Sequence, residues 1–206
     1  MWVVKLGGSL YGDATLPGWL QLLAELGGGR VVIVCGGGSF ADAVRQRQAH
    51  WHFPDLAAHN MAVLAMAQGA FMLQGLQPAL RLAGSEEDIQ RDLRGGHTVV
   101  WQPYELLRVA PDDNTHWGHT SDSIALALAR RLNVERLVVV KSCEVDAQAS
   151  LAQLGAAGII DPSFAPEAAD AGFAIDIVPR ERLDWVREQL LAGSGPPASP
   201  GHARWR

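Results

Sequence analysis

The stretch Val31-Val32-Ile33-Val34-Cys35-Gly36-Gly37-Gly38-Ser39-Phe40 decides the fold of this chain. It opens with an apolar, mostly β-branched run without alternation, which is typical of a strand buried on both faces of a parallel sheet. Ser39, with Asp42 in the capping-box position, is expected to cap a helix that begins at Phe40. A strand that leads through glycines into a helix N-terminus offers bare N–H groups to an anion, usually phosphate. A tight turn without a ligand is the alternative.

A second stretch of the same kind opens the chain: Trp2-Val3-Val4-Lys5-Leu6-Gly7-Gly8-Ser9-Leu10. Two such turns at the carboxyl ends of parallel strands would lie where open α/β sheets bind their ligands. Neither turn matches the P-loop or the dinucleotide fingerprint. The phosphate-binding candidates are therefore Gly7, Gly8, Ser9, Gly36, Gly37 and Gly38.

The composition predicts a globular chain of one domain. Its length of 206 residues suits one α/β domain, and its net charge of −5 provides no basic footprint for nucleic acid. Cys35 and Cys143 follow apolar strands, which indicates reduced cytoplasmic thiols rather than a disulfide framework. We expect no signal peptide, no apolar run long enough to span a bilayer, and no membrane partner.

Apolar strands alternate with segments of helical periodicity along the chain. This order predicts a three-layer αβα sandwich with a mostly parallel central sheet over residues 1–192. Residues 193–206 are rich in Gly, Pro and Ser, and we expect a disordered tail there. The expected strands are 2–6, 31–35, 80–82, 98–101, 137–140 and 173–178, and the main expected helices are 16–26, 40–48, 59–74, 120–132 and 182–191.

Lys5 and Lys141 are the only lysines among the 17 basic residues, and each stands at the end of an apolar strand. A compact ammonium in that place suits a phosphoryl group in transfer. Asp122 is expected in the first turn of a helix capped by Thr120 or Ser121, where the helix dipole favours an ionised carboxylate. Glycine turns, a cation and an anion that orients the cation are what phosphoryl transfer needs.

In these features the chain resembles the amino acid kinase superfamily, which includes acetylglutamate, aspartate, uridylate and isopentenyl phosphate kinases. The resemblance runs from Met1 to about Leu191 and rests on Lys5–Ser9, Gly36–Phe40 and Thr120–Asp122. Within the superfamily the chain is most similar to the aminomethylfuran phosphate kinases of methanofuran biosynthesis. That narrower likeness rests on Ser39-Phe40-Ala41, His59, His116-Trp117, Asp161-Pro162-Ser163-Phe164 and Pro179-Arg180-Glu181-Arg182.

The resemblance implies an ATP-dependent kinase that converts a small phosphate monoester to a diphosphate. Lys5 would neutralise the transferred group, Asp122 would hold Lys5, and Lys141 is the third catalytic candidate. ATP would also contact Ser142 and Asp146, with Mg²⁺ held mainly by the ATP phosphates. The long methionine-rich helix suggests a homodimer. The acceptor candidates are Ser39, Arg45, His59, His116, Trp117 and Thr120.

The stretch Lys141-Ser142-Cys143-Glu144-Val145-Asp146 departs from the family's usual Thr-Asp-Val-Asp-Gly loop, and no later lysine follows it. Either Lys141 takes the place of the later lysine, or ATP binds weakly, or catalysis is lost. The alternative functions are another small-molecule kinase of the superfamily, acting on isopentenyl phosphate, uridylate or an amino acid carboxylate, and a non-catalytic nucleotide- or anion-binding relative. The histidine spacing matches no metal motif, so we expect no metal site.

Overall fold

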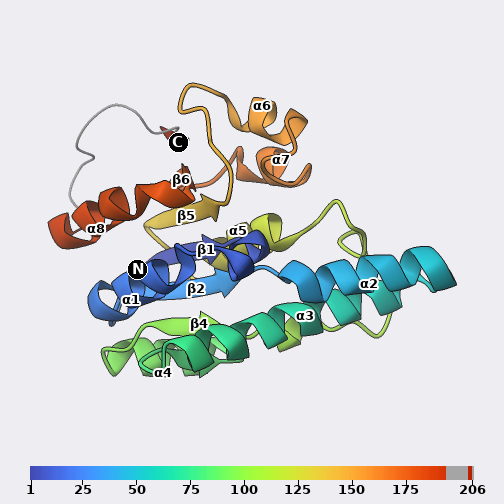
Figure 1. The fold of residues 1–206 in the computed structure, drawn as a ribbon, viewed down its shortest axis with the longest axis horizontal. Helices are drawn as coiled ribbons and strands as arrows, with labels where there is room; N and C mark the ends of the chain where they lie inside the picture. The colour runs from blue at the N-terminus through green and yellow to red at the C-terminus, as the bar shows by residue number, and fades with distance from the viewer. Residues whose placement is uncertain (194–203, 206) are drawn as a thin grey trace.

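The computed structural model describes residues 1–193 and 204–205. A mixed sheet in the order β3-β4-β2-β1-β5-β6-β7 forms the middle layer (Figure 1). Neighbouring strands from β3 to β6 are parallel, and β7 is antiparallel to β6. The strands are β1 (Trp2–Leu6), β2 (Val31–Cys35), β3 (Arg81–Ala83), β4 (Val99–Trp101), β5 (Arg136–Lys141), β6 (Ala174–Pro179) and β7 (Arg204–Trp205).

Helices cover both faces of the sheet, as predicted for a three-layer αβα sandwich. The core on one face joins the sheet to α1, α3 and α8, and the core on the other joins it to α4, α5, α6 and α7. The α-helices are α1 (Leu16–Leu26), α2 (Gly38–Trp51), α3 (Asp55–Leu76), α4 (Glu86–Arg94), α5 (Ser121–Arg131), α6 (Leu151–Ala156), α7 (Phe164–Ala168) and α8 (Leu183–Ala192). The short 3-10 helices are η1 (Gly8–Gly12), η2 (Tyr104–Leu106) and η3 (Arg180–Arg182).

The two strands that carry the glycine turns lie side by side in the middle of the sheet. Every residue of β1 and of β2 is buried, as expected for strands covered on both faces. β1 pairs with β2 on one side and with β5 on the other. The carboxyl ends of these three strands therefore meet at one edge, and Lys141 ends the third of them.

The expected caps of two helices are wrong. α2 begins at Gly38, and Gly37 is its N-cap residue with no side-chain cap, so Ser39 already lies inside the first turn. The tight glycine turn leads the chain into the helix before Ser39 is reached. The carboxylate of Asp42, which was expected in the capping box, pairs with Arg45 at 2.8 Å instead. Neither Thr120 nor Ser121 caps α5 with its own side chain. The carboxylate of Asp161 takes that role.

Helix α3 is longer than predicted. It is also more apolar than expected, since the sequence was expected to contain no run long and apolar enough to span a bilayer. It begins at Asp55 rather than His59, and its mean hydropathy reaches 1.4, so by length and composition it meets the criterion for a membrane-spanning helix. Its side chains Val63, Ala70 and Leu73 are buried in the core of the sandwich. Packing in that core accounts for part of its apolar composition, since 44% of the apolar window is buried. Figure 1 shows α3 running beside α2 along much of its length.

Short elements of the carboxyl-terminal half were not predicted. Helices α6 and α7 each span less than two turns, and the core buries Leu154 and Phe164 from them. The predicted disordered tail, residues 193–206, falls mostly on 194–203 and 206, which lie outside the described residues. Residues Arg204–Trp205 pair with β6.

Candidate active site

The two glycine turns pack directly against each other, backbone on backbone. A Cβ atom added at Gly8 would lie 2.1 Å from the nitrogen of Gly38, and one added at Gly36 would lie 2.5 Å from the nitrogen of Gly8. Gly38 itself has a φ of 52°, which favours glycine. The glycines are therefore required by the approach of the two turns, whether or not a ligand binds there.

Two of the expected phosphate-binding N–H groups are engaged elsewhere. The N–H of Gly7 donates to the carbonyl of Val140 at 3.3 Å, and the N–H of Gly36 donates to the carbonyl of Leu6 at 2.9 Å. The backbone of neighbouring strands therefore already uses these two N–H groups, and a phosphate-binding role for Gly7 and Gly36 stays a prediction. The first turn of α2, which starts at Gly38, still presents N–H groups that have no carbonyl partner within the helix.

Tyr11 fixes the second turn and was missed by sequence reasoning. Its ring packs on the Cα of Gly38, its hydroxyl lies against Gly69 of α3, and that hydroxyl donates a hydrogen bond to the carbonyl of Gly36. Burial, with a smaller effect of the neighbouring Cys35, raises the pKa of Tyr11 well above its usual range. The phenol is therefore a neutral donor that holds the Gly36 peptide in place.

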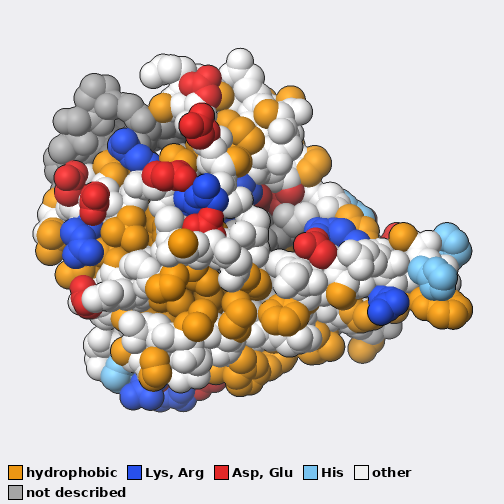
Figure 2. Space-filling model, in the orientation of Figure 1, with side chains coloured by type: hydrophobic (Ala, Val, Ile, Leu, Met, Phe, Trp, Pro, Cys, Tyr) orange, Lys and Arg blue, Asp and Glu red, His pale blue; other side chains and the backbone are white. Residues whose placement is uncertain are grey.

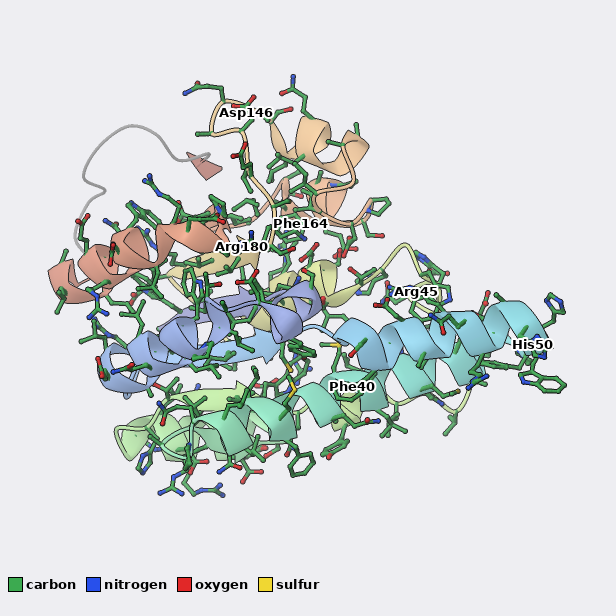
Figure 3. All side chains as sticks on the ribbon, viewed as in Figure 1. Phe40, Arg45, His50, Asp146, Phe164 and Arg180 are labelled. Carbon is green, nitrogen blue, oxygen red and sulfur yellow. The ribbon has the colours of Figure 1, made fainter. Side chains whose placement is uncertain are left out.

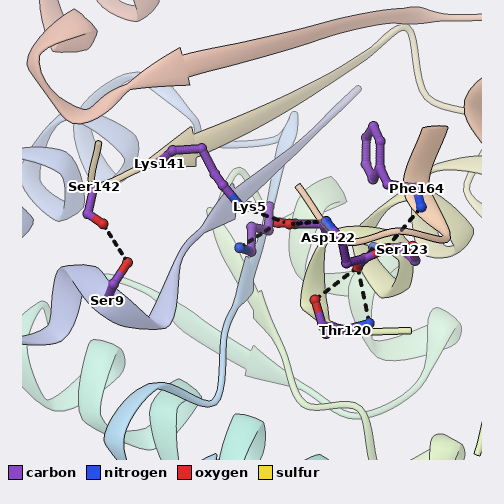
Figure 4. A network of polar contacts seen from close by, with 9 residues as sticks. Lys5, Ser9, Thr120, Asp122, Ser123, Lys141, Ser142 and Phe164 are labelled. Carbon is purple, nitrogen blue, oxygen red and sulfur yellow. Dashed lines mark hydrogen bonds and ion pairs between the residues drawn. The ribbon is translucent and has the colours of Figure 1, made fainter. Parts of the chain in front are cut away.

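Both lysines of the chain converge on Asp122 (Figure 4). The Nζ atom of Lys5 lies 2.7 Å from Oδ1 of Asp122, and the Nζ atom of Lys141 lies 2.8 Å from Oδ2. The side chains of Lys5, Asp122 and Lys141 are only 5%, 4% and 14% exposed. We call this group the lysine cluster. Two ammonium groups against one carboxylate leave an excess positive charge beside the glycine turns.

The surroundings of the lysine cluster shift the pKa values of its members in a way that keeps Asp122 ionised. Burial alone would raise the pKa of Asp122, but Lys5 and Lys141 outweigh burial and lower that pKa to about 2. Burial, followed by the charge of Lys5, lowers the pKa of Lys141, and Asp122 opposes both effects. Asp122 is therefore a fixed anion that orients the lysines, and it is too weak a base to accept a proton.

Ser9 and Ser142 meet beside the lysine cluster, whereas Asp146 lies apart. The hydroxyl oxygens of Ser9 and Ser142 are 2.8 Å apart, which links the first glycine turn to the segment that follows β5. Asp146 is exposed, and its carboxylate accepts a hydrogen bond from the N–H of Gln148 at 2.9 Å. Figure 3 shows Asp146 far from Arg45 and Phe40 of α2. Ser142 therefore contacts the first glycine turn, and the ATP-binding roles expected of Ser142 and Asp146 stay predictions.

A cavity of about 680 Å³ opens beside the glycine turns, between α2, α3 and the segment that precedes α5. Its lining includes most of the expected phosphate- and acceptor-binding residues, namely Gly8, Ser9, Gly36, Gly37, Gly38, Ser39, Arg45, His59, His116, Trp117 and Thr120. Its lining also includes Asp42 and His119, which fall within the stretches 39–45 and 116–120 expected to bind the acceptor, and Tyr11, Asp55 and Met66, which were not predicted. The size suits a small molecule.

Two side chains shape the cavity through contacts between distant parts of the chain. The guanidinium of Arg45 lies 4.4 Å from the ring centroid of Trp117, and the indole N–H of Trp117 donates to Gln48 at 2.7 Å. These contacts hold the segment before α5 against α2. Nε2 of His59, which also lines the cavity, lies 2.9 Å from the carbonyl of Leu106, so one ring nitrogen of His59 is already used.

Solved structures with the same fold cover nearly the whole chain. A uridylate kinase from Archaeoglobus fulgidus superposes with a TM-score of 0.68 at 15% identity, over 91% of this chain and 95% of that one. A UMP kinase from Bacillus anthracis gives 0.67 at 15% identity, over 94% and 92% of the two chains. An isopentenyl phosphate kinase gives 0.59 at 14% identity, over 93% and 96%. At these identities the likeness establishes the fold.

Sequence comparison identifies the family. A curated relative from Methanocaldococcus jannaschii, named [5-(aminomethyl)furan-3-yl]methyl phosphate kinase, is 26% identical over 140 residues. The match spans 68% of this chain and 64% of the relative, which is less than two thirds of the relative's length. The family model of the amino acid kinase family matches residues 1–145, which is well over half of the chain. The chain therefore belongs to the amino acid kinase family.

Proposed function

We propose that this protein is an ATP-dependent kinase that transfers the γ-phosphoryl group to a small phosphate monoester and forms a diphosphate. The observation that carries the proposal is the convergence of Lys5 and Lys141 on Asp122, beside two glycine turns and a cavity of about 680 Å³. Phosphoryl transfer depends on positioning and on neutralising charge at the transferred group. A buried cluster with excess positive charge provides that neutralisation without reorganising.

In the proposed reaction an acceptor oxygen attacks the γ-phosphorus in line. The bond to the oxygen that bridges the β and γ phosphorus atoms breaks, and ADP leaves with that electron pair. Lys5 and Lys141 neutralise the charge on the moving group. Because Lys5 and Lys141 lower the pKa of Asp122 to about 2 against the effect of burial, that carboxylate is no general base. An acceptor phosphate needs none, since its oxygen is already ionised at neutral pH.

The residues at the site suit a nucleotide whose metal is bound through its phosphates. Ser142 and Ser9 lie at the edge of the lysine cluster, and we assign them to the ATP phosphates. No group of three or more His, Cys, Asp or Glu side chains arranged to hold a metal occurs among residues 1–193 and 204–205. We therefore propose that Mg²⁺ is held mainly by ATP oxygens and water, where it would neutralise phosphate charge.

The cavity favours a polar, ring-sized acceptor such as an aminomethylfuran phosphate. The start of α2 faces one part of the cavity and would bind the acceptor phosphate. Trp117 and His116 offer aromatic surface, and the carboxylates of Asp42 and Asp55 in the lining would attract an amine. The name of the Methanocaldococcus relative supports this acceptor. Isopentenyl phosphate, uridylate and amino acid carboxylates are the alternatives within the family.

The unpartnered face of α3 supports the proposal that the enzyme is a homodimer. Met61, Leu64 and Phe71 recur on one side of this helix and are 40%, 43% and 54% exposed. We call these three residues the α3 stripe. Figure 2 shows hydrophobic side chains gathered on the lower half of the molecule, where Figure 1 places α3.

The free thiols of Cys35 and Cys143 accord with a cytoplasmic enzyme.

Phosphoryl transfer from Mg–ATP to a panel of acceptors, followed by ³¹P NMR, tests the proposed function. The panel contains aminomethylfuran phosphate, isopentenyl phosphate, uridylate, acetylglutamate and aspartate. Lys5→Ala and Asp122→Asn should each lower kcat roughly 100-fold or more, because the charge that stabilises the transferred group is lost or misplaced. Arg94→Ala removes an exposed cation on α4 and should leave kcat unchanged.

Turnover close to that of the wild type in both Lys5→Ala and Asp122→Asn would contradict the proposed mechanism. A wild-type protein that binds Mg–ATP in calorimetry but phosphorylates none of the acceptors would instead be the non-catalytic relative. The unusual segment 141–146 is what keeps that second candidate function in consideration.

A further inference from the structure

The carboxylate of Asp161, in the connection between α6 and α7, caps the amino-terminal end of α5. Its Oδ2 atom accepts hydrogen bonds from the N–H of Thr120 at 3.1 Å, the hydroxyl of Thr120 at 2.9 Å and the N–H of Ser123 at 3.0 Å. Its Oδ1 atom accepts from the hydroxyl of Ser123 and from the N–H of Phe164 at 3.0 Å. Asp161 is only 7% exposed, so these five bonds are protected from water.

These bonds enclose Asp122, which lies between Thr120 and Ser123. The N–H of Asp161 also points at the site and donates to Oδ2 of Asp122 at 3.3 Å. That oxygen is the one that binds Lys141. Figure 4 draws the contacts of Thr120 and Ser123 next to those that join Asp122 to the two lysines. Asp161 therefore holds the first turn of α5 by its side chain and the Asp122 carboxylate by its backbone.

We propose that Asp161 is a positioning residue for phosphoryl transfer, which fixes the Asp122 carboxylate between Lys5 and Lys141. The inference rests on the proposed function and adds a residue to it. Without the Asp161 carboxylate, the buried N–H groups of Thr120 and Ser123 lose their acceptor. The first turn of α5 then loosens and Asp122 moves. The ammonium groups of Lys5 and Lys141 are then no longer held at a fixed distance from each other.

A merely structural cap would behave differently, and the chain supplies one for comparison. Ser85 caps α4, where its hydroxyl accepts a hydrogen bond from the N–H of Asp88 at 3.1 Å. α4 packs against β3 and β4 at the far end of the sheet, away from the lysine cluster. Loss of either cap is expected to lower the stability of the protein. Only the loss of the Asp161 cap is expected to disturb the lysine cluster.

The first test compares Asp161→Asn with Ser85→Ala in steady-state kinetics of the full-length enzyme, with folding checked by circular dichroism. Asp161→Asn should lower kcat about 10-fold or more and leave the acceptor KM within about twofold, since the loss falls on groups that act in the transition state. Ser85→Ala should keep the wild-type kcat at a similar loss of thermal stability. A kcat within about twofold of wild type in Asp161→Asn overturns the inference.

The second test does not depend on catalysis. Because the chain has only two lysines, labelling with [ε-¹³C]lysine gives two ¹³C signals, which Lys141→Arg assigns. Asp161→Asn should shift both signals, whereas Ser85→Ala should not. Unchanged signals overturn the inference even if the wild type phosphorylates no acceptor. If Asp161→Asn does not fold, Ser123→Ala, which removes one donor to Asp161, should produce the same shifts at smaller size.

Discussion

At the scale of single residues, Asp122 makes the stability of the fold depend on pH in the acidic range. Its pKa is lowered from 3.8 to about 2 in the folded protein, where Lys5 and Lys141 outweigh the opposing effect of burial. A carboxyl with a lowered pKa stabilises the fold above its unfolded pKa and loses that contribution as the pH falls through the folded value. The shift corresponds to roughly 2 kcal/mol.

Urea unfolding between pH 7 and pH 2 measures this contribution. The free energy of unfolding of the wild type should fall by roughly 2 kcal/mol as the pH drops from about 4 through about 2. Asp122→Asn should be less stable at neutral pH and should lack this part of the decline. Asp170→Asn, which changes an exposed carboxyl, should follow the wild type. An equal decline in Asp122→Asn and the wild type would assign the acid sensitivity to other groups.

The contact between the glycine turns gives a second prediction for single residues. Gly8→Ala places a methyl group 2.1 Å from the backbone nitrogen of Gly38, so one turn must move. We expect a loss of about 1–3 kcal/mol in the free energy of unfolding, as for other overpacked sites. Gly12→Ala meets no atom within 4 Å and should stay within about 0.5 kcal/mol of the wild type. Equal stabilities of the two variants in chemical unfolding would refute the close packing.

At the scale of elements, α3 carries two glycines with opposite roles. A Cβ atom at Gly69 would lie 2.0 Å from the hydroxyl of Tyr11, whereas one at Gly75 would meet nothing within 4 Å. Gly75→Ala should therefore stabilise the protein by about 0.5–1 kcal/mol, because alanine has less backbone freedom than glycine in the unfolded chain. Gly69→Ala should destabilise it and displace Tyr11. Thermal unfolding of both variants checks the opposite signs, and a gain in both would contradict the assigned place of Tyr11.

Elements with a regular pattern of their own were predictable, and elements made by distant contacts were not. The unbroken β-branched run of Val31–Cys35 became β2 with the predicted bounds, because both faces of that strand are covered. α6 and α7 were missed, since a helix as short as Phe164–Ala168 depends on burying Phe164 against α5. The capping box of Ser150 and Gln153 was a local signal for α6 that we did not use.

The same distinction holds within the candidate site. The pairing of Lys5 with Asp122 was expected from their residue types and their places at the ends of elements. Tyr11 carried no local signal, because its partner Gly36 lies 25 residues away in sequence. Asp161 stood in a motif of the resemblance, but its contact with Thr120 across 41 residues could not be predicted from the sequence. The N–H of Gly36 was assigned to phosphate because the sequence does not show that the sheet continues far enough to engage it.

At the scale of the whole molecule, the strand order explains why the site forms where it does. β1 lies between β2 and β5, so the two glycine turns and Lys141 reach the same edge of the sheet. Lys141 is the last residue of β5, and its ammonium therefore reaches Asp122 from this same edge. The strand order thus brings both lysines to the two glycine turns.

The α3 stripe makes the last prediction, on assembly. Light scattering after gel filtration should give about twice the chain mass of 22.1 kDa for the wild type. Phe71→Asp places a carboxylate in the α3 stripe, where its desolvation disfavours association, and should yield the 22.1 kDa monomer. Leu191→Asp changes an exposed apolar residue on α8, which is 67% exposed against 54% for Phe71, and should leave the dimer intact. A dimer that survives Phe71→Asp but not Leu191→Asp would move the interface to α8, and a monomeric wild type would remove the proposal.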